Sequence, residues 1–272
     1  MEYQIKPSGG LRLGWRELRD YRELFYYFTW RDIKVRYKQT VLGAAWALLQ
    51  PILLTVVFTL FFGKALGIDS GKIPYPLFVF PGMLMWGLFS NGINGASNSM
   101  LSASNIIKKI YFPRLILPIS ALLASLVDFI ITFILLLILM TYYGLVERVP
   151  SLLIIAPISI SITFMALIGA GCFFAALNVK YRDFRYVIPF FLQALFFLTP
   201  VIYPVRLLPE GWMQDLLSYH PVGISIDLLR DIISSDPIEW ASVLKGLVVA
   251  SIMLLIGVFY FRRTENYFAD LA

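Results

Sequence analysis

The sequence predicts an all-α protein that crosses a membrane several times, and its composition and pattern support this in three ways. Of its 272 residues, 59% are hydrophobic and only 15% are charged, whereas an average soluble domain has about 25% charged residues. The apolar residues gather into long runs, and a helix needs roughly 20 such residues to cross about 30 Å of hydrocarbon. Basic residues gather between the runs. We expect six spans, at approximately 41–66, 76–100, 115–143, 152–177, 186–203 and 241–261.

The segment 13–38 precedes the first span and mixes apolar with charged residues. This composition is typical of an amphipathic helix that lies in the membrane interface. Its last basic residues, Arg31, Lys34, Arg36 and Lys38, lead directly into apolar sequence, so we expect them in the head-group zone. Two interpretations stay open: the segment either anchors and orients the chain or forms a gate for an anionic head group of a substrate.

Basic residues are distributed unequally between the two sides of the predicted membrane. Seventeen of the 23 Lys and Arg residues fall on the side of the N-terminus. Cytoplasmic segments carry this excess in membrane proteins, so we expect both termini in the cytoplasm. The net charge of +6 therefore reports topology and contact with anionic lipids rather than nucleic-acid binding. The other side has six basic residues, Lys64, Lys72, Arg148, Arg206, Arg230 and Lys245.

The segment between the second and third spans predicts a short amphipathic helix at about 104–112. It starts with polar residues, continues with the pair Lys108 and Lys109, and is followed by Pro113. Ser104 or Asn105 is expected to cap this helix and Pro113 to stop it. Such an element suits the docking of a cytosolic partner, and an ordinary basic connecting loop is the alternative.

Two polar features lie inside predicted spans. Asn91, Asn94 and Asn98 recur at helical spacing on the second span. They are expected either to bond neighbouring helices, which we favour, or to line a polar path. Asp128 lies deep in the third span, where a carboxylate is a candidate functional residue. With no basic residue close to it in the sequence, we expect local bonds from Ser125 and Thr132.

Other segments predict packing and shape. Pro51, and Pro81 with Gly82, are expected to bend the first two spans. The fourth span carries a face of small residues for close helix contact, Ala166, Gly169, Ala170 and Gly171. The long segment 204–239 has apolar residues at helical spacing, interrupted by Pro221 and Gly223. It predicts two short helices that turn back at the outer surface.

Catalytic and nucleotide-binding motifs are missing from the sequence. No G-x-x-x-x-G-K-[ST] loop is present, so we expect no bound ATP and no cofactor in this chain. His220 is the one histidine and Cys172 the one cysteine, which leaves no set with metal-ligand spacing. We expect a structural His220, a Cys172 that packs as a small residue, and no catalytic residue. An intramembrane enzyme would need a second buried titratable group, and a secondary transporter more often shows internal repeats.

Four stretches together resemble the membrane subunit of bacterial polysaccharide ABC exporters, within the ABC-2 permease family. They are WRDIKVRYKQTVLGAAWALLQP, FPGMLMWGLFSNG, NIIKKIYFPRLILP and LNVKYRDFRYVIPFFLQ. The resemblance covers essentially the whole chain and implies a single transmembrane domain. It implies a homodimer in the bacterial inner membrane that binds two cytosolic ATPase subunits, which hold ATP and Mg. The implied cargo is a lipid-linked polysaccharide, most simply O antigen, with a smaller lipid or drug as the alternative.

The same resemblance implies roles for particular residues. The short helix would couple to the ATPase through Asn105, Ile106, Lys108, Lys109 and Tyr111. The first and fifth spans would line the channel with aromatic rings that contact sugars, and we select Trp46, Phe58, Phe197 and Tyr203. We also expect the basic group at the end of segment 13–38 to attract the diphosphate of a lipid carrier, because phosphate pairs well with clustered Arg and Lys.

Overall fold

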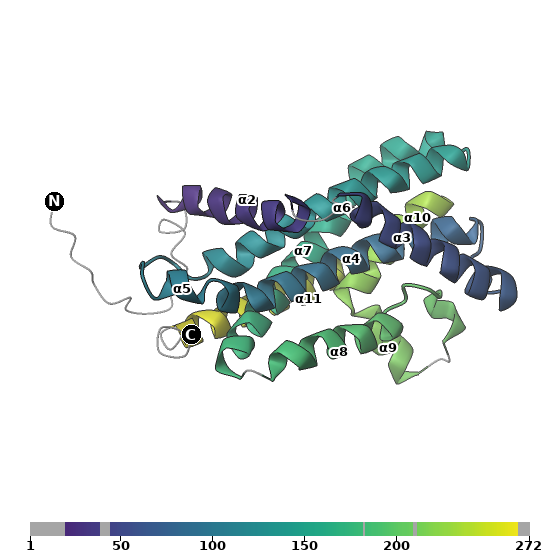
Figure 1. The fold of residues 1–272 in the computed structure, drawn as a ribbon. Helices are drawn as coiled ribbons and strands as arrows, with labels where there is room; N and C mark the ends of the chain where they lie inside the picture. Colours follow the sequence, from purple (N-terminus) through teal and green to yellow (C-terminus); the bar gives the residue numbers. More distant parts are fainter. Residues whose placement is uncertain (1–19, 39–43, 182, 209–210, 266–272) are drawn as a thin grey trace.

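A computed structural model describes residues 20–38, 44–181, 183–208 and 211–265. Helices joined by turns make up these residues, and no β-strand occurs among them, which confirms the all-α prediction (Figure 1). In chain order the elements are α2 (Arg22–Lys38), α3 (Ala44–Phe58), the π-helix η1 (Thr59–Ala65), α4 (Tyr75–Ser102), α5 (Ser104–Ile107), α6 (Ile116–Tyr142), the 3-10 helix η2 (Val146–Arg148), α7 (Val149–Lys180), α8 (Phe184–Leu198), the 3-10 helix η3 (Val205–Leu207), α9 (Trp212–Ser218), α10 (Pro221–Ser234) and α11 (Trp240–Thr264).

Five helices are long and apolar enough to cross a membrane, which makes this a multi-pass membrane protein. They comprise Leu48–Ala65, Tyr75–Ser102, Ile116–Tyr142, Val146–Lys180 and Trp240–Thr264. The predicted fifth span corresponds to α8, which has 15 residues. At 1.5 Å per residue it extends about 22 Å, which is shorter than the hydrocarbon layer. The count of six spans therefore stays a prediction, as do residues 41–43 of the first span, which lie outside the described part of the chain.

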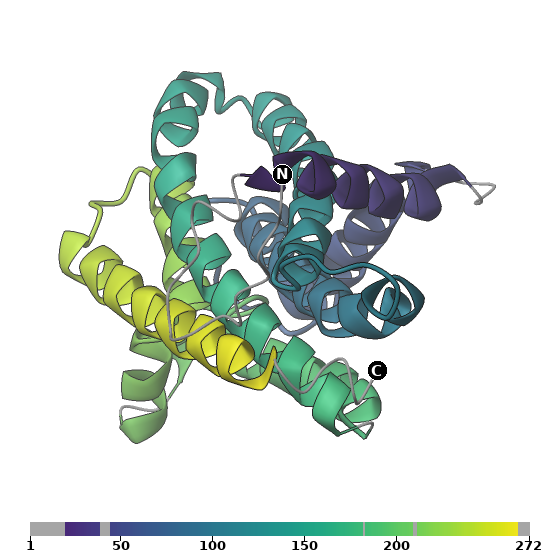
Figure 2. The same ribbon diagram turned by 90° about the vertical axis from the view of Figure 1, so that its left-hand side faces the viewer.

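Helix α4 is the centre of the bundle, and α3 lies at its edge (Figures 1 and 2). In the most apolar window of α4, 78% of the residues are buried, against 6% for the span Leu48–Ala65, which α3 and η1 form together. The chain that follows α8 packs tightly on α4: a Cβ on Gly82 would lie 2.7 Å from the carbonyl oxygen of Val201. The Tyr75 hydroxyl also donates a hydrogen bond to the Ile202 carbonyl, at 2.6 Å. Glycine at position 82 permits this close approach.

Helices α7 and α11 cross with their backbones in contact, at two glycines. A Cβ on Gly169 would lie 2.2 Å from the Met253 carbonyl oxygen, and one on Gly257 would lie 1.9 Å from the Gly169 carbonyl oxygen. Small residues allow this approach between membrane helices. The predicted small-residue contact face of the fourth span is therefore confirmed: Gly169 contacts α11, whereas Gly171 faces Ala96 of α4 and Leu122 of α6.

The predicted outer segment forms two helices, α9 and α10, as expected. Helix α10 packs against α4, α7 and α11, and its predicted apolar residues Ile224, Leu228, Leu229 and Ile232 are buried. Arg230, which the sequence places among exposed loop charges, is also buried, because α10 folds into the bundle. Its guanidinium lies 3.7 Å from the centre of the Phe78 ring. It donates hydrogen bonds to the carbonyls of Phe78, Pro200 and Val201, at 2.9, 2.8 and 2.6 Å.

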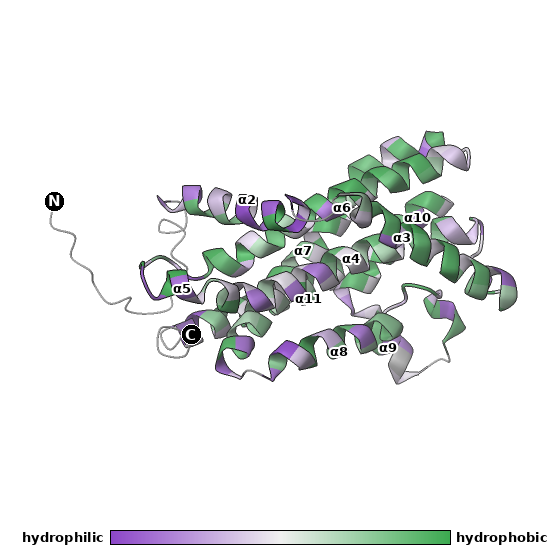
Figure 3. Ribbon diagram, viewed as in Figure 1, coloured by the Kyte–Doolittle hydropathy of each residue, from purple (hydrophilic) through white to green (hydrophobic). Residues whose placement is uncertain are grey.

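Helix α2 packs along the first half of α6 (Figure 1). Phe28 is 2% exposed, and its ring centre lies 5.7 Å from that of Phe112, just before α6. Hydrophilic residues are concentrated on α2 and around α5, whereas the long helices are mainly apolar (Figure 3). This distribution suits an interfacial helix, and its depth in a membrane stays a prediction.

Candidate functional site

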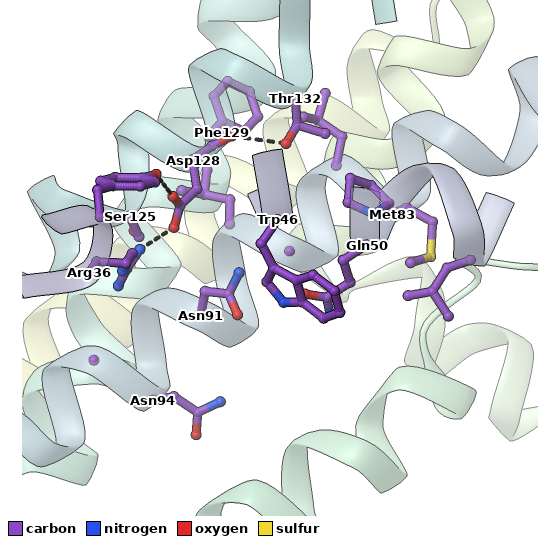
Figure 4. Close-up of a pocket in the computed structure, with 17 residues that line it drawn as sticks. Arg36, Trp46, Gln50, Met83, Asn91, Asn94, Ser125, Asp128, Phe129 and Thr132 are labelled. Carbon is purple, nitrogen blue, oxygen red and sulfur yellow. Dashed lines mark hydrogen bonds and ion pairs between the residues drawn. The ribbon is translucent and has the colours of Figure 1, made fainter. Parts of the chain in front are cut away.

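A cavity of about 740 Å³ lies between α2, α3, α4 and α6 (Figure 4). Arg36 and Tyr37 come from the end of α2, and Trp46 and Gln50 come from consecutive turns of α3. Helix α4 supplies apolar residues and two amides, and α6 supplies Asp128 with its neighbours. Helix α8 contributes none of the described lining residues, which are Arg36, Tyr37, Trp46, Gln50, Pro51, Leu54, Met83, Leu84, Gly87, Leu88, Asn91, Asn94, Gly95, Ser125, Asp128, Phe129 and Thr132.

Asp128 forms an ion pair with Arg36 and accepts a hydrogen bond from the Tyr37 hydroxyl (Figure 4). Both carboxylate oxygens are therefore bonded from α2. The expectation of purely local bonds was wrong, since Ser125 donates to the Leu122 carbonyl and Thr132 to the backbone carbonyl of Asp128. Burial, followed by the hydrogen bond to Asp128, raises the pKa of Tyr37, so its hydroxyl keeps the proton that it donates.

Only one of the three predicted asparagines bonds another helix. The Asn178 amide of α7 donates to the Asn98 side-chain oxygen at 3.4 Å, and Asn98 donates to the Asn94 carbonyl. Asn91 and Asn94 line the cavity, and their side chains have no hydrogen bond to the described residues. For these two, a polar path fits better than the interhelical bonds that the spacing favoured.

The four basic residues at the end of α2 have different surroundings. Arg31 pairs with Asp32 at 2.8 Å and lies 4.8 Å from the Phe28 ring centre. Lys34 lies 5.4 Å from the Trp30 ring centre, and Lys38 is the exposed last residue of the helix. Arg36 alone is turned into the cavity, toward Asp128. Their attraction for a diphosphate stays a prediction.

The four selected aromatic residues do not share one surface. Trp46 lines the cavity and is 53% exposed. Phe58 packs against Phe196 of α8, with ring centres 5.9 Å apart, and the exposed Phe197 packs edge to face on the same ring. Tyr203 donates its hydroxyl to the Phe197 carbonyl at 2.9 Å, near the end of α8. A channel-lining role for all four stays a prediction, and Trp46 alone lies in this cavity.

The short helix expected at 104–112 is a single turn, α5, followed by exposed residues. It spans Ser104–Ile107 and ends six residues before Pro113, so the expected stop was wrong. The expected caps were also wrong, because Ala103 occupies the N-cap position without a side-chain bond. Asn105, Lys108, Lys109 and Tyr111 are exposed, whereas Ile106 is half-buried. A hollow of about 210 Å³ opens beside them, lined by residues 107–112 and Arg114.

This turn is joined to the end of α11. The backbone N–H of Arg114 donates to the Glu265 carboxylate at 3.0 Å, and the Arg114 guanidinium donates to the Glu265 carbonyl. The exposed turn is therefore continuous with α4 and α6 along the chain and is linked by these hydrogen bonds to the end of α11. Since α5 is too short to be an independent helix, its position depends on these neighbours.

His220 has a structural role, as the sequence suggested. Its Nδ1 accepts a hydrogen bond from the Gly223 N–H at 3.2 Å and caps α10. Among the residues that the structure describes, no three His, Cys, Asp or Glu side chains form a possible metal site. Sequence reasoning missed Gln50 and Tyr37. Gln50 carried a signal, because it is an amide in an apolar run, four residues after Trp46 and thus on the same helical face.

The matches to known proteins and to a protein family cover most of the chain. The family described as ABC-2 type transporter matches residues 23–234. The chain is 29% identical over 255 residues to an O-antigen export system permease protein of Myxococcus xanthus, which covers 92% of this chain and 96% of that protein. For a protein of the same name from Klebsiella pneumoniae, the identity is 24% over 250 residues, with coverages of 92% and 95%. A polysialic acid transport protein of Escherichia coli is 23% identical over 242 residues, with coverages of 87% and 91%.

Proposed function

Because the chain belongs to the ABC-2 type transporter family, we propose that it is the membrane permease of an ATP-driven exporter of lipid-linked polysaccharide. The observation that carries this proposal is similarity over nearly the full chain to permeases named for O-antigen export and polysialic acid transport. The chain itself is the non-catalytic subunit. Energy comes from ATP and Mg on a separate ATPase, consistent with the absence of a P-loop motif from the sequence.

The active unit is a dimer of this chain with two ATPase subunits. Helix α3 supports the dimer, since very little of it is covered by the rest of the chain. The exposed turn around Lys108 and Lys109 is the docking element for the ATPase, because it is cationic, protruding and joined to three long helices. The permease lies in the bacterial inner membrane, and the excess of Lys and Arg on the side of this turn supports a cytoplasmic location for the turn and for both termini.

The end of α2 supplies the charge for the carrier diphosphate. Arg31, Lys34 and Lys38 serve this role at the membrane face, and Arg36 is held by Asp128 at the cavity wall. A diphosphate bound by the end of α2 would therefore lie next to the cavity. The head group could then bind at the end of α2 while the attached sugar chain extends toward the cavity.

Purification of the tagged chain in mild detergent, with surface glycan analysis of a deletion strain, tests the proposal. We expect an ATPase subunit in equal amount, ATP hydrolysis by the complex, and loss of a surface polysaccharide that the intact gene restores. Recovery of the chain alone, under conditions that preserve other membrane complexes, would contradict an ABC mechanism. An unchanged surface glycan in a strain that lacks the chain would contradict the assigned cargo.

A further inference from the structure

The cavity between α2, α3, α4 and α6 has polar walls at membrane depth. Asn91 and Asn94 lie eleven and eight residues before Ser102, the last residue of α4, which is about 16 and 12 Å from that end at 1.5 Å per residue. Neither side chain bonds any described residue. Within hydrocarbon, polar groups need partners from protein, water or ligand. The Asn91 side chain is exposed and that of Asn94 is half-buried, so two free amides open into the cavity and could bind a polar occupant.

The walls combine three neutral amides and one indole with apolar side chains, among them Leu54, Leu88 and Phe129. Gln50, Asn91 and Asn94 each offer both donors and an acceptor, and Trp46 is half-exposed beside Gln50. Arg36 and Asp128 are the charged residues among the described lining, and they neutralise each other. The site therefore has no free charge for a phosphate, and an acyl chain would leave the amides of Asn91 and Asn94 without hydrogen bonds.

A polyhydroxylated, uncharged ligand matches these walls. Sugar hydroxyls both donate and accept hydrogen bonds, as the three amides do, and the C–H face of a sugar ring packs on an aromatic face. The volume of about 740 Å³ lies within the 300 to 1,000 Å³ typical of small-molecule sites. We propose that this cavity is a saccharide-binding site, which holds a sugar unit of the exported chain through Gln50, Asn91 and Asn94, with Trp46 as the stacking surface.

This inference rests on the proposed function and adds a location to it. The site shares Trp46 with the aromatic path expected on the first and fifth spans but differs from that path otherwise, because no described residue of α8 lines it. It lies next to the end of α2, where the carrier diphosphate is proposed to sit. A sugar close to the diphosphate would enter the cavity while the head group stays at the basic residues outside.

Photo-crosslinking in cells that make the polysaccharide tests this site. The photoreactive amino acid p-benzoylphenylalanine replaces Gln50, and the control replaces Leu53, which is exposed on the same helix but outside the cavity. With the ATPase inactivated to stall export, we expect a carbohydrate-positive adduct from position 50 and none from position 53. A strain unable to make the glycan should give no such adduct.

Three results would overturn the saccharide site. A carbohydrate-free adduct with the mass of two chains would mean that a second subunit covers the cavity. An adduct with lipid alone would mean an acyl chain occupies it. Absence of any glycan adduct, in a strain that exports glycan through this chain, would mean that the sugar passes elsewhere. Failure of the proposed function itself is recognised separately, because surface glycan would then persist after deletion.

A second variant removes the hydrogen bonds and keeps the volume. Asn91→Leu combined with Asn94→Leu should lower the glycan adduct at position 50 about tenfold, as expected for the loss of two hydrogen bonds. The matched control is Gln193→Leu, an exposed amide on α8 that does not line the cavity. Equal adduct yield in the double variant and the control, with equal amounts of chain and bound ATPase, would contradict the role of the two amides.

Discussion

The Arg36 and Asp128 pair connects the end of α2 to the interior of α6. Asp128 lies twelve residues after Ile116, about 18 Å along the helix. The pair is partly buried, and removing one partner would leave the other charge uncompensated at this depth. The pair therefore fixes where α2 ends and closes one wall of the cavity.

We predict that the double variant Arg36→Met with Asp128→Leu is more stable than either single variant. Each single variant leaves one charge in the bundle, whereas the double variant leaves none. We expect a coupling energy of about 1 to 3 kcal/mol from the double-mutant cycle, measured from unfolding in detergent. Arg31→Met is the matched control, since Arg31 pairs with its neighbour Asp32 and should change stability little. Strictly additive effects would show that the two side chains act independently.

His220 and Asp231 give stability opposite dependences on pH. Burial lowers the pKa of His220 from 6.5 to about 4, so stability is lost as the pH falls through this range and the unfolded chain takes up a proton. Burial, with nearby Asp227, Asp236 and Glu239, raises the pKa of Asp231 from 3.8 to about 6. The folded state then holds a proton that the unfolded chain loses, so stability falls as the pH rises through that window.

Single variants should separate these two effects between about pH 4 and 6. With His220→Asn, which keeps a side chain able to cap α10, stability should fall as the pH rises. With Asp231→Asn it should rise, and the double variant should lack both contributions, so its slope should lie between those of the single variants. Apparent Tm against pH in detergent is the measurement. Slopes of the same sign in the two single variants would refute this assignment.

At the scale of elements, the crossing of α7 and α11 depends on glycine backbones in contact. We predict that Gly169→Ala and Gly257→Ala each lower the free energy of unfolding by about 1 to 3 kcal/mol, because the added Cβ meets backbone that cannot move aside. Gly87→Ala in α4 is the control, since its Cβ would meet nothing within 4 Å and alanine favours a helix. An unchanged free energy of unfolding in both variants would mean that α7 and α11 can move apart at no energetic cost.

The turn after α5 is the element for which we predict a partner. Reversing its charge with Lys108→Glu and Lys109→Glu should reduce co-purification of the ATPase, because both side chains are exposed at the protruding end. Lys64→Glu, a charge reversal on exposed η1 after α3, should leave the complex intact. The measurement is the ratio of ATPase to permease after purification of each variant. Normal ratios and normal transport-coupled hydrolysis would remove the docking role.

At the scale of the whole molecule, the sequence predicted what depends on local pattern. Apolar runs located the long helices, and small residues located the α7 contact face, because length and spacing determine these features directly. The partner of Asp128 was not predictable, since Arg36 is 92 residues away and only the packing of α2 on α6 brings them together. The burial of Arg230 was not predictable either, because it depends on the folding of α10 into the bundle, which brings together residues far apart in the sequence.

The arrangement of the chain across the membrane gives a further prediction. Cys172 is the single cysteine and is buried, so an introduced cysteine can be labelled without background. Lys109→Cys should react with a membrane-impermeant maleimide only after spheroplasts are permeabilised, because the excess of Lys and Arg predicts a cytoplasmic location for this end. Lys64→Cys lies exposed in η1, at the other end of α4, and should react in intact spheroplasts. Labelling of Lys109→Cys in intact spheroplasts would reverse the orientation and place the docking turn away from cytosolic ATP.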